Sequence, residues 1–445
     1  MNNYVSQLDA ILPSGMTGTV VESDGSTIAV AGFPAPVGAV ARIDNGIAEG
    51  LPAEVIGFRD QWTLLSPIGA LQGVRRGQRV ALARTSRSVA VGETLLGRVI
   101  DAHGQPIDGG HESLLTARQP IYAPGPSATA RPRIDSPLST GVRAIDGMLT
   151  VGRGQRLGIF AGSGVGKSVL LGMMARGTSA SIRVIALIGE RGREVNDFIE
   201  RDLGPEAMRN TVVVVATSDQ PAVARVQAVL TATAVAEYFR DSGNEVLLLV
   251  DSLTRLAMAQ REIGLAAGEP PTTRGYPPSV FALLPRVVER AGRTKTGSIT
   301  AFYSVLVEGD DLNEPVSDSV RGLLDGHIVL SRDLAAKGHY PAIDVLSSIS
   351  RVMPDVTTAD HQSAIRALRQ HMSTYREYSD LIAIGAYQRG ASSVVDAAID
   401  SKTDIDRFLR QDVREPSTVQ TASQAAMQLA LECASRKPDN VKQEA

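Results

Sequence analysis

The sequence predicts an α/β protein in three parts: a small β-barrel over residues 1–84, an α/β domain with a parallel sheet over 85–354, and a helical domain with a polar tail over 355–445. Three observations support this prediction. The first part alternates short β-branched runs with turn signals, the second alternates apolar runs with longer helical stretches, and the third has apolar residues only at helical spacing. With 445 residues, 43% of them hydrophobic, the chain can build two or three domains.

The barrel is predicted from Thr17 to about Arg84, where runs of Val, Ile and Ala are separated by turn signals such as Arg76-Gly77-Gln78. Short strands at this spacing are typical of a small closed sheet. A connector is expected from about Thr116 to Pro137, because its five prolines exclude a regular helix or a central strand.

Five apolar runs predict the strands of the central sheet. Each is short and apolar at most positions, as expected for parallel strands that are covered by helices on both faces. The five runs are Arg156–Phe160, Arg183–Ile188, Thr211–Ala216, Glu245–Val250 and Ser298–Tyr303.

After about Pro354 the strand pattern ends and a helical pattern begins. Apolar side chains recur there at spacings of three, four, three and seven, which places them on one face of a helix. These residues are Ile365, Leu368, Met372, Tyr375 and Ile382.

The composition narrows the functional class. The net charge is -3, from 45 Lys plus Arg against 48 Asp plus Glu, so no global positive field favours nucleic acid or an anionic membrane. The single cysteine, Cys433, excludes an internal disulfide framework and a cysteine-rich metal site. The first residues lack an export signal, and no run approaches the ~20 apolar residues of a membrane span. We therefore expect a cytoplasmic protein.

The motif A-G-S-G-V-G-K-S occupies Ala161 to Ser168, between an apolar strand and an apolar helix. Its glycines let successive backbone N–H groups turn toward a polyphosphate at the positive end of the helix dipole. Lys167 is expected to contact the β and γ phosphates, and Ser168 to offer its hydroxyl to Mg2+. The usual motif begins with Gly, so Ala161 is a small departure. A glycine-rich turn with a solvated lysine is the alternative.

Two acidic residues follow strands of the same domain. Asp251 ends the run V-L-L-L-V-D, at the sheet edge where ligands bind, and is expected to hold the magnesium through water. A helix cap is its alternative role. Glu190, just past another strand, is the candidate base that orients the attacking water. Its alternative is a surface glutamate paired with Arg191 or Arg193.

Phosphoryl transfer also benefits from an arginine that stabilises the developing charge. Arg351, which follows the apolar run D-V-L-S-S-I-S, is the candidate, although composition alone does not distinguish it from other arginines. Tyr340 offers an apolar face for adenine, with simple packing as its alternative role.

Taken together, the motifs resemble the type III protein-export ATPases, which are relatives of the catalytic subunit of rotary ATP synthases. The likeness spans about Thr17 to Phe408. The segment from D-S-L-T-R to G-Y-P-P-S-V-F is similar to the flagellar branch rather than the injectisome branch, and the C-terminal part lacks the acidic loop of the synthases. The motifs are G-I-F-A-G-S-G-V-G-K-S, A-L-I-G-E-R-G-R-E-V-N-D-F, D-S-L-T-R, G-Y-P-P-S-V-F, V-L-V-E-G-D-D-L-N-E-P, D-G-H-I-V-L-S-R and G-H-Y-P-A-I-D.

The resemblance implies a RecA-like nucleotide domain and a homohexamer with ATP and Mg2+ sites between subunits. It makes Lys167, Glu190 and Arg351 catalytic, with Arg351 inserted from the neighbouring subunit, and it makes Ser168 and Asp251 the metal-binding residues. The nucleotide-binding residues that it implies are Gly162, Ser163, Gly164, Val165, Gly166, Lys167, Ser168, Arg191, Tyr340 and, as a second wall for adenine, Phe408.

The resemblance also implies partners: a stalk protein in the ring centre, a regulator that binds the N-terminal region, the export gate, and chaperone-bound substrates at the inner membrane. Only about 16 residues precede the first expected strand, fewer than in many flagellar members.

A nucleic-acid translocase is one alternative function, but an aromatic content of 4% offers few residues that could stack on bases. A noncatalytic nucleotide-binding subunit is another, and Glu190 argues against it.

Overall fold

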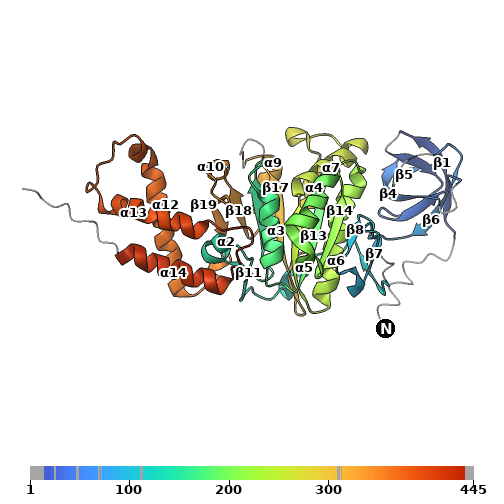
Figure 1. Ribbon diagram of the computed structural model, residues 1–445. Helices are drawn as coiled ribbons and strands as arrows, with labels where there is room; N and C mark the ends of the chain where they lie inside the picture. The colour runs from blue at the N-terminus through green and yellow to red at the C-terminus, as the bar shows by residue number, and fades with distance from the viewer. Residues whose placement is uncertain are drawn as a thin grey trace, which may run out of the picture.

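The computed structural model describes residues 15–435 except 25–26, 47–49, 69–70, 72, 111–113, 308–310 and 312. Figure 1 shows three parts in a row, with the barrel at one end, the sheet domain in the middle and the C-terminal helices at the other end. The predicted fold class is confirmed. The N-terminal region that was expected to bind a regulator lies largely outside the described residues.

Six strands close the barrel in the order β1-β2-β5-β4-β3-β6. All neighbouring pairs are antiparallel, and the interior is filled by small and β-branched side chains such as Val30, Ala41 and Val55. The strands are β1 (Thr17–Ser23), β2 (Ile28–Ala31), β3 (Val40–Ile43), β4 (Leu51–Arg59), β5 (Trp62–Pro67) and β6 (Arg79–Arg84).

The connector contains more regular structure than its prolines suggest. Its first residues form β9 (Ala117–Pro120), which pairs antiparallel with β7 (Ser88–Val91) in a two-stranded ribbon. Pro120 is tolerated because it ends the strand, at the edge of a ribbon rather than inside a sheet. Other short elements between the barrel and Arg156 include η1 (Glu93–Leu95), η2 (Ala128–Ala130), β10 (Pro137–Leu138) and β11 (Val151–Gly152).

The central sheet has the order β19-β18-β12-β17-β15-β13-β14-β8, with β16 paired to β17. All five predicted strands are present, and the path from β18 to β8 is parallel. Antiparallel β19 forms one edge. The strands are β8 (Val99–Asp101), β12 (Arg156–Ala161), β13 (Ile182–Ile188), β14 (Thr211–Ala216), β15 (Glu245–Asp251), β16 (Gly292–Arg293), β17 (Ser298–Leu306), β18 (Gly326–Leu330) and β19 (Ile343–Ser350).

Helices cover both faces of this sheet (Figure 1). The strands between them are buried along almost their whole length, which explains why they lack polar alternation. The helical segments are α2 (Arg143–Met148), α3 (Lys167–Gly177), α4 (Gly192–Asp197), η3 (Phe198–Leu203), α5 (Gly204–Met208), α6 (Ala222–Asp241), α7 (Leu253–Ala266), η4 (Thr273–Gly275), α8 (Pro278–Val288), α9 (Pro315–Leu323) and α10 (Arg332–Ala336).

The C-terminal part consists of α11 (Met353–Val356), α12 (Ala359–Ala383), α13 (Ser393–Leu409) and α14 (Val419–Ser435). Its apolar residues Ile365, Leu368 and Leu409 belong to the same buried cluster as Met174 of α3. The helical layer is therefore packed onto the sheet domain and does not form a separate core. No helix among the described residues is long and apolar enough to cross a membrane.

Candidate active site

The phosphate loop connects the buried end of β12 to the first turn of α3. Gly164 and Gly166 have φ of 78° and 89°, a conformation that favours glycine. This backbone turns the loop toward the N-terminus of α3, which begins at Lys167, where N–H groups lack helical partners. Ala161 is the last residue of β12, and a side chain at this position is accommodated in the core.

Lys167 lies beside the end of β15. Its ammonium forms an ion pair with Asp251, which is 3% exposed. Ser304 of β17 donates a hydrogen bond of 2.6 Å to the same carboxylate oxygen of Asp251. The carboxylate is thereby held at the carboxyl edge of the sheet, next to the loop, as expected for a residue that serves a bound nucleotide.

Glu190 lies 3.9 Å from Lys167, measured from its Oε1 to the lysine Nζ. Burial raises the pKa of Glu190 to about 7, with a further contribution from the negative charge of Asp251, while Lys167 opposes the rise. A carboxyl with a pKa close to neutral pH is suited to accept and release a proton under physiological conditions. Sequence reasoning named the residue, but only the packing reveals this environment.

Arg191 and Glu194 surround the base on the solvent side. Arg191 is exposed and precedes α4, and its backbone N–H donates to Glu194 Oε2 at 3.5 Å. Glu194, which the sequence reasoning did not single out, interacts with Glu190, and hydrogen bonding to Glu190 holds the pKa of Glu194 below its usual range. Glu194 occupies the third position of α4, three residues after the N-cap Arg191, and an acidic residue at this capping-box position is the signal that could have indicated it.

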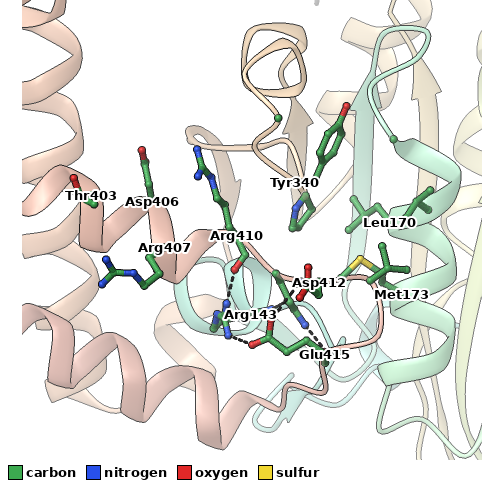
Figure 2. Close-up of a pocket in the computed structure, with 16 residues that line it drawn as sticks. Arg143, Leu170, Met173, Tyr340, Thr403, Asp406, Arg407, Arg410, Asp412 and Glu415 are labelled. Atoms are coloured by element: carbon green, nitrogen blue, oxygen red, sulfur yellow. Dashed lines mark hydrogen bonds and ion pairs between the residues drawn. The ribbon is translucent and has the colours of Figure 1, made fainter.

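A cavity of about 1050 Å3 opens beside the phosphate loop (Figure 2). Gly166 and Leu170 line it on one side, and Tyr340 faces them from the loop before β19. A Cβ at position 166 would lie 3.4 Å from the Tyr340 ring, so the ring lies directly beside the loop. Tyr340 is 46% exposed and presents an apolar face to the cavity.

The opposite wall of the cavity is polar and is formed by α2, the end of α13 and the segment that follows α13. Arg143 of α2 forms an ion pair with Glu415, and Asp406 and Arg410 project from the end of α13 (Figure 2). No local sequence signal indicates this wall, because Asp406, Arg410 and Glu415 are more than 200 positions from the phosphate loop and meet it only through packing.

Phe408 lies elsewhere than the expected second wall. Its ring packs against Gly147 of α2, where an added Cβ would lie 2.8 Å from the ring, and Arg143 lies over it at 6.0 Å. Phe408 is not among the residues that line the cavity. The helical period explains this placement, because Thr403, Asp406 and Arg407 occupy the cavity side of α13 and Phe408 lies on the adjacent side.

Arg351 lies at the opposite end of the strands from its own phosphate loop. β18 runs parallel to β12, with Leu330 beside Ala161, and β19 runs antiparallel to β18, with Ser350 beside Gly326. The end of β19 is therefore near the start of β12, about one strand length, or roughly 15–20 Å, from the loop. Arg351 is exposed there, and its own subunit's loop is out of reach.

The oxygen donors at the loop fit a hard divalent cation. Ser168 offers a hydroxyl in the first turn of α3, and Asp251 offers a buried carboxylate. A group of three or more His, Cys, Asp or Glu able to hold a metal unaided is absent from the described residues. These donors therefore suit Mg2+ that arrives with phosphate oxygens, as in other phosphate-loop sites.

Ser304 is the other residue near the loop that sequence reasoning missed. Its hydroxyl lies in the buried part of β17, a strand that also contains Ser298, Thr300 and Tyr303. Because β17 pairs with β15 in parallel register, Ser304 lies next to the end of that strand and reaches Asp251. A polar residue in such a strand is the signal that could have indicated it.

The barrel, the parallel sheet and the strand–loop–helix site define the chain as a phosphate-loop ATPase. Residues 141–350 match the family model of the ATP synthase alpha/beta family, nucleotide-binding domain. Residues 357–428 match the T3SS EscN ATPase C-terminal domain.

Curated relatives agree with this class. The flagellum-specific ATP synthase of Bacillus subtilis is 53% identical, over 85% of this chain and 86% of the relative. Two relatives come from Salmonella typhimurium. Its SPI-2 type 3 secretion system ATPase is 54% identical over 81% of this chain and 83% of the relative, and its flagellum-specific ATP synthase is 46% identical over 96% of both.

The solved structure of the assembled ATPase EscN, from the type III secretion system of enteropathogenic E. coli, superimposes with a TM-score of 0.88. It is 44% identical and covers 93% of this chain and 100% of the EscN chain. The chain belongs to the family of type III secretion and flagellar export ATPases.

Proposed function

We propose that this chain binds and hydrolyses MgATP to drive protein export by the flagellar type III apparatus. The observation that carries the proposal is the convergence of Lys167, Asp251 and Glu190 at one phosphate loop, with Glu190 poised to ionise near neutral pH. A noncatalytic nucleotide-binding subunit would not need such a carboxyl.

The loop residues each have a defined task. The amides from Gly162 to Ser168 hold the phosphates, and Lys167 exchanges its ion pair with Asp251 for contacts to the β and γ phosphates. Ser168 and Asp251 would hold Mg2+, which neutralises charge that develops on the phosphate oxygens. Glu190 orients the attacking water and accepts its proton. Tyr340 stacks on adenine.

The position of Arg351 supports a ring in which each site is completed by the neighbour. Because Arg351 is exposed about a strand length from its own loop, it serves the adjacent subunit, where it stabilises the transition state. A homohexamer is the assembly that we propose, with a stalk protein in its centre. EscN has also been solved in complex with its central stalk EscO, with a TM-score of 0.86 to this chain.

The flagellar assignment is supported by the segment from D-S-L-T-R to G-Y-P-P-S-V-F and by the extent of the flagellar relatives, one of which covers 96% of the chain. In this role the ring works in the cytoplasm, peripherally at the inner-membrane export gate, on chaperone-bound substrates, under a regulator that binds the N-terminal region. The ATPase of an injectisome is the second candidate, because the SPI-2 relative is 54% identical.

Salmonella typhimurium provides a single host for the decisive experiment, because it has relatives of both types. The full chain is expressed in a strain without its flagellum-specific ATP synthase and in a strain without its SPI-2 ATPase. We expect restored swimming in the first strain and no restored secretion in the second, with the Lys167→Ala variant as the inactive control. Restored secretion without swimming would assign the chain to an injectisome.

A further inference from the structure

A second cavity adjoins the nucleotide cavity. It has a volume of about 490 Å3 and lies between α10 and β19 of the sheet domain and α12 and α13 of the helical layer. Much of its wall is apolar, including Leu334, Met372 and Ile405. Asp406 and Arg410 line both this cavity and the nucleotide cavity, so only the end of α13 separates the two.

His339 gives this cavity a buried polar group without a partner. The side chain lines the cavity and is 3% exposed, yet its Nε2 has no hydrogen-bond partner among the described residues. A buried polar group without a partner is unfavourable, and a bound acceptor would remove this cost. Burial holds the pKa of His339 below its usual value, so the ring is neutral and retains one N–H to donate.

The charged groups around the cavity leave an excess of cations. Arg376 pairs with Asp344 at 2.6 Å, and Lys402 pairs with Asp406. Within the described part of the chain, no ion pair involves the two remaining cations, Lys337 and Arg410, and a single further carboxylate, Asp333, lines the cavity. An apolar wall with a positive edge suits a molecule that combines an apolar body with an acidic group.

We propose that this cavity is a second ligand site, for a small amphipathic anion. The anion's acidic group lies against Lys337, Arg410 and His339, and its body lies against the apolar wall between the sheet domain and the helices. This ligand is distinct from the nucleotide, whose site is at the phosphate loop.

The two sites are coupled through a single peptide bond. His339 lines the second cavity, and Tyr340, the next residue, lines the nucleotide cavity together with Arg410 (Figure 2). The carbonyl of Tyr340 accepts a hydrogen bond of 3.0 Å from Gln411, just after α13. An anion that fixes His339 and Arg410 therefore changes the nucleotide affinity. This coupling rests on the proposed adenine role of Tyr340, whereas the binding does not.

Binding is tested with the fluorescent aromatic sulfonate 1-anilinonaphthalene-8-sulfonate as the probe, titrated onto the full chain without nucleotide. We expect saturable binding that is weakened about fivefold or more by Lys337→Glu, because this exposed position changes charge without disturbing the core. His339→Leu removes the donor and should lower the affinity for the probe about two- to fivefold. Lys295→Glu, at an exposed lysine of another surface hollow, is the matched control and should bind normally.

Coupling is tested by repeating the titration at increasing ADP concentrations. Two coupled sites give a probe affinity that changes about threefold or more and then reaches a plateau, with the same factor for ADP at saturating probe. Probe affinity that falls without limit as ADP rises would place the probe in the nucleotide cavity and overturn the proposal. Equal probe affinity in wild type, Lys337→Glu and His339→Leu would also overturn it. A probe affinity that is independent of ADP would overturn the coupling alone.

Discussion

At the residue scale, the chemistry of the site depends on the environment of Glu190. The carboxyl is largely withdrawn from water and shares its surroundings with Asp251, so its charged form is disfavoured until the pH approaches 7. The nearby Lys167 partly offsets this effect. The residue therefore needs no large pKa change to act as a base at neutral pH.

Replacing Glu190 by Gln keeps the size of the side chain but removes the base. We expect steady-state ATP hydrolysis to fall by about 10²- to 10⁴-fold, whereas affinity for a fluorescent ATP analogue should change little, because the phosphates are held by the loop. Glu194→Gln is the matched variant and should retain most of the activity. Turnover by Glu190→Gln within a few-fold of wild type would remove this residue from the mechanism.

The raised pKa also predicts how stability depends on pH. The pKa of Glu190 is about 7 in the folded chain against 4.5 for an ordinary glutamate, so between these values the folded state binds more protons than the unfolded state. Stability therefore decreases as the pH rises through this window, by up to about 1.4 kcal/mol per pKa unit. The melting temperature of Glu190→Gln, relative to wild type, should be higher at pH 8 than at pH 5. An equal difference at both pH values would contradict the burial argument.

At the element scale, the phosphate loop and a buried ion pair show how helices are held in place. The loop needs a residue with left-handed backbone at position 166 to start α3, and Gly166 also leaves space for Tyr340.

A buried ion pair links α6 to the end of α8. Arg290 and Glu237 are 1% and 2% exposed, and Arg290 donates two hydrogen bonds of 2.9 and 2.6 Å to the Glu237 carboxylate. Arg290 also donates to the carbonyl of Ile121 in the connector.

Gly166→Ala should damage nucleotide binding without unfolding the protein. The left-handed backbone costs a residue with a Cβ about 1–2 kcal/mol, and the Cβ would press on Tyr340 at 3.4 Å. We expect the affinity for ATP to fall by about tenfold, measured by calorimetry. Gly322→Ala is the matched control, because a Cβ at this position in α9 has no neighbour within 4 Å. Unchanged affinity in Gly166→Ala would mean that the loop relaxes freely.

Removing one partner of the buried ion pair should destabilise the sheet domain. Glu237→Ala leaves the Arg290 charge buried without compensation, so we expect a loss of about 3–5 kcal/mol in the free energy of unfolding, measured with denaturant. The pair Arg225 and Glu262 also links α6 to α7, but Glu262 is 63% exposed. Glu262→Ala should therefore lower the free energy of unfolding by about 1 kcal/mol or less. Similar losses in the two variants would show that burial does not determine the cost.

At the scale of the whole molecule, the strand directions separate the phosphate loop from Arg351, the proposed catalytic arginine. The phosphate loop, Glu190 and Asp251 lie at the carboxyl edge of the parallel strands, whereas antiparallel β19 carries Arg351 to the other edge. Each subunit therefore has a phosphate loop with Glu190 and Asp251 at one end of its strands and Arg351 at the other end. In the proposed ring, each interface between subunits would bring the loop of one subunit next to the Arg351 of its neighbour.

Mixing two inactive variants tests this arrangement. Lys167→Ala lacks a working loop and Arg351→Ala lacks the arginine, so each alone should be nearly inactive at ring-forming concentrations. In an equimolar mixture, about a quarter of the interfaces combine an intact loop with an intact neighbouring arginine, and ATP hydrolysis should recover accordingly. A mixture as inactive as its parents, although rings form, would show that Arg351 does not act between subunits.

The sequence by itself determined the features that are encoded locally. The phosphate loop follows from glycine spacing and the flanking apolar runs, and the five central strands follow from buried runs such as Glu245–Val250, because backbone conformation and periodicity are properties of neighbouring residues. The tertiary structure decided the strand order, which adds β8 from before the connector as an edge strand beside β14 and places Arg351 at the end of the strands away from the phosphate loop. It also placed Ser304 on Asp251 and Phe408 on α2. These outcomes depend on pairing and packing between segments that are distant in the sequence, and a local sequence pattern does not reveal those interactions.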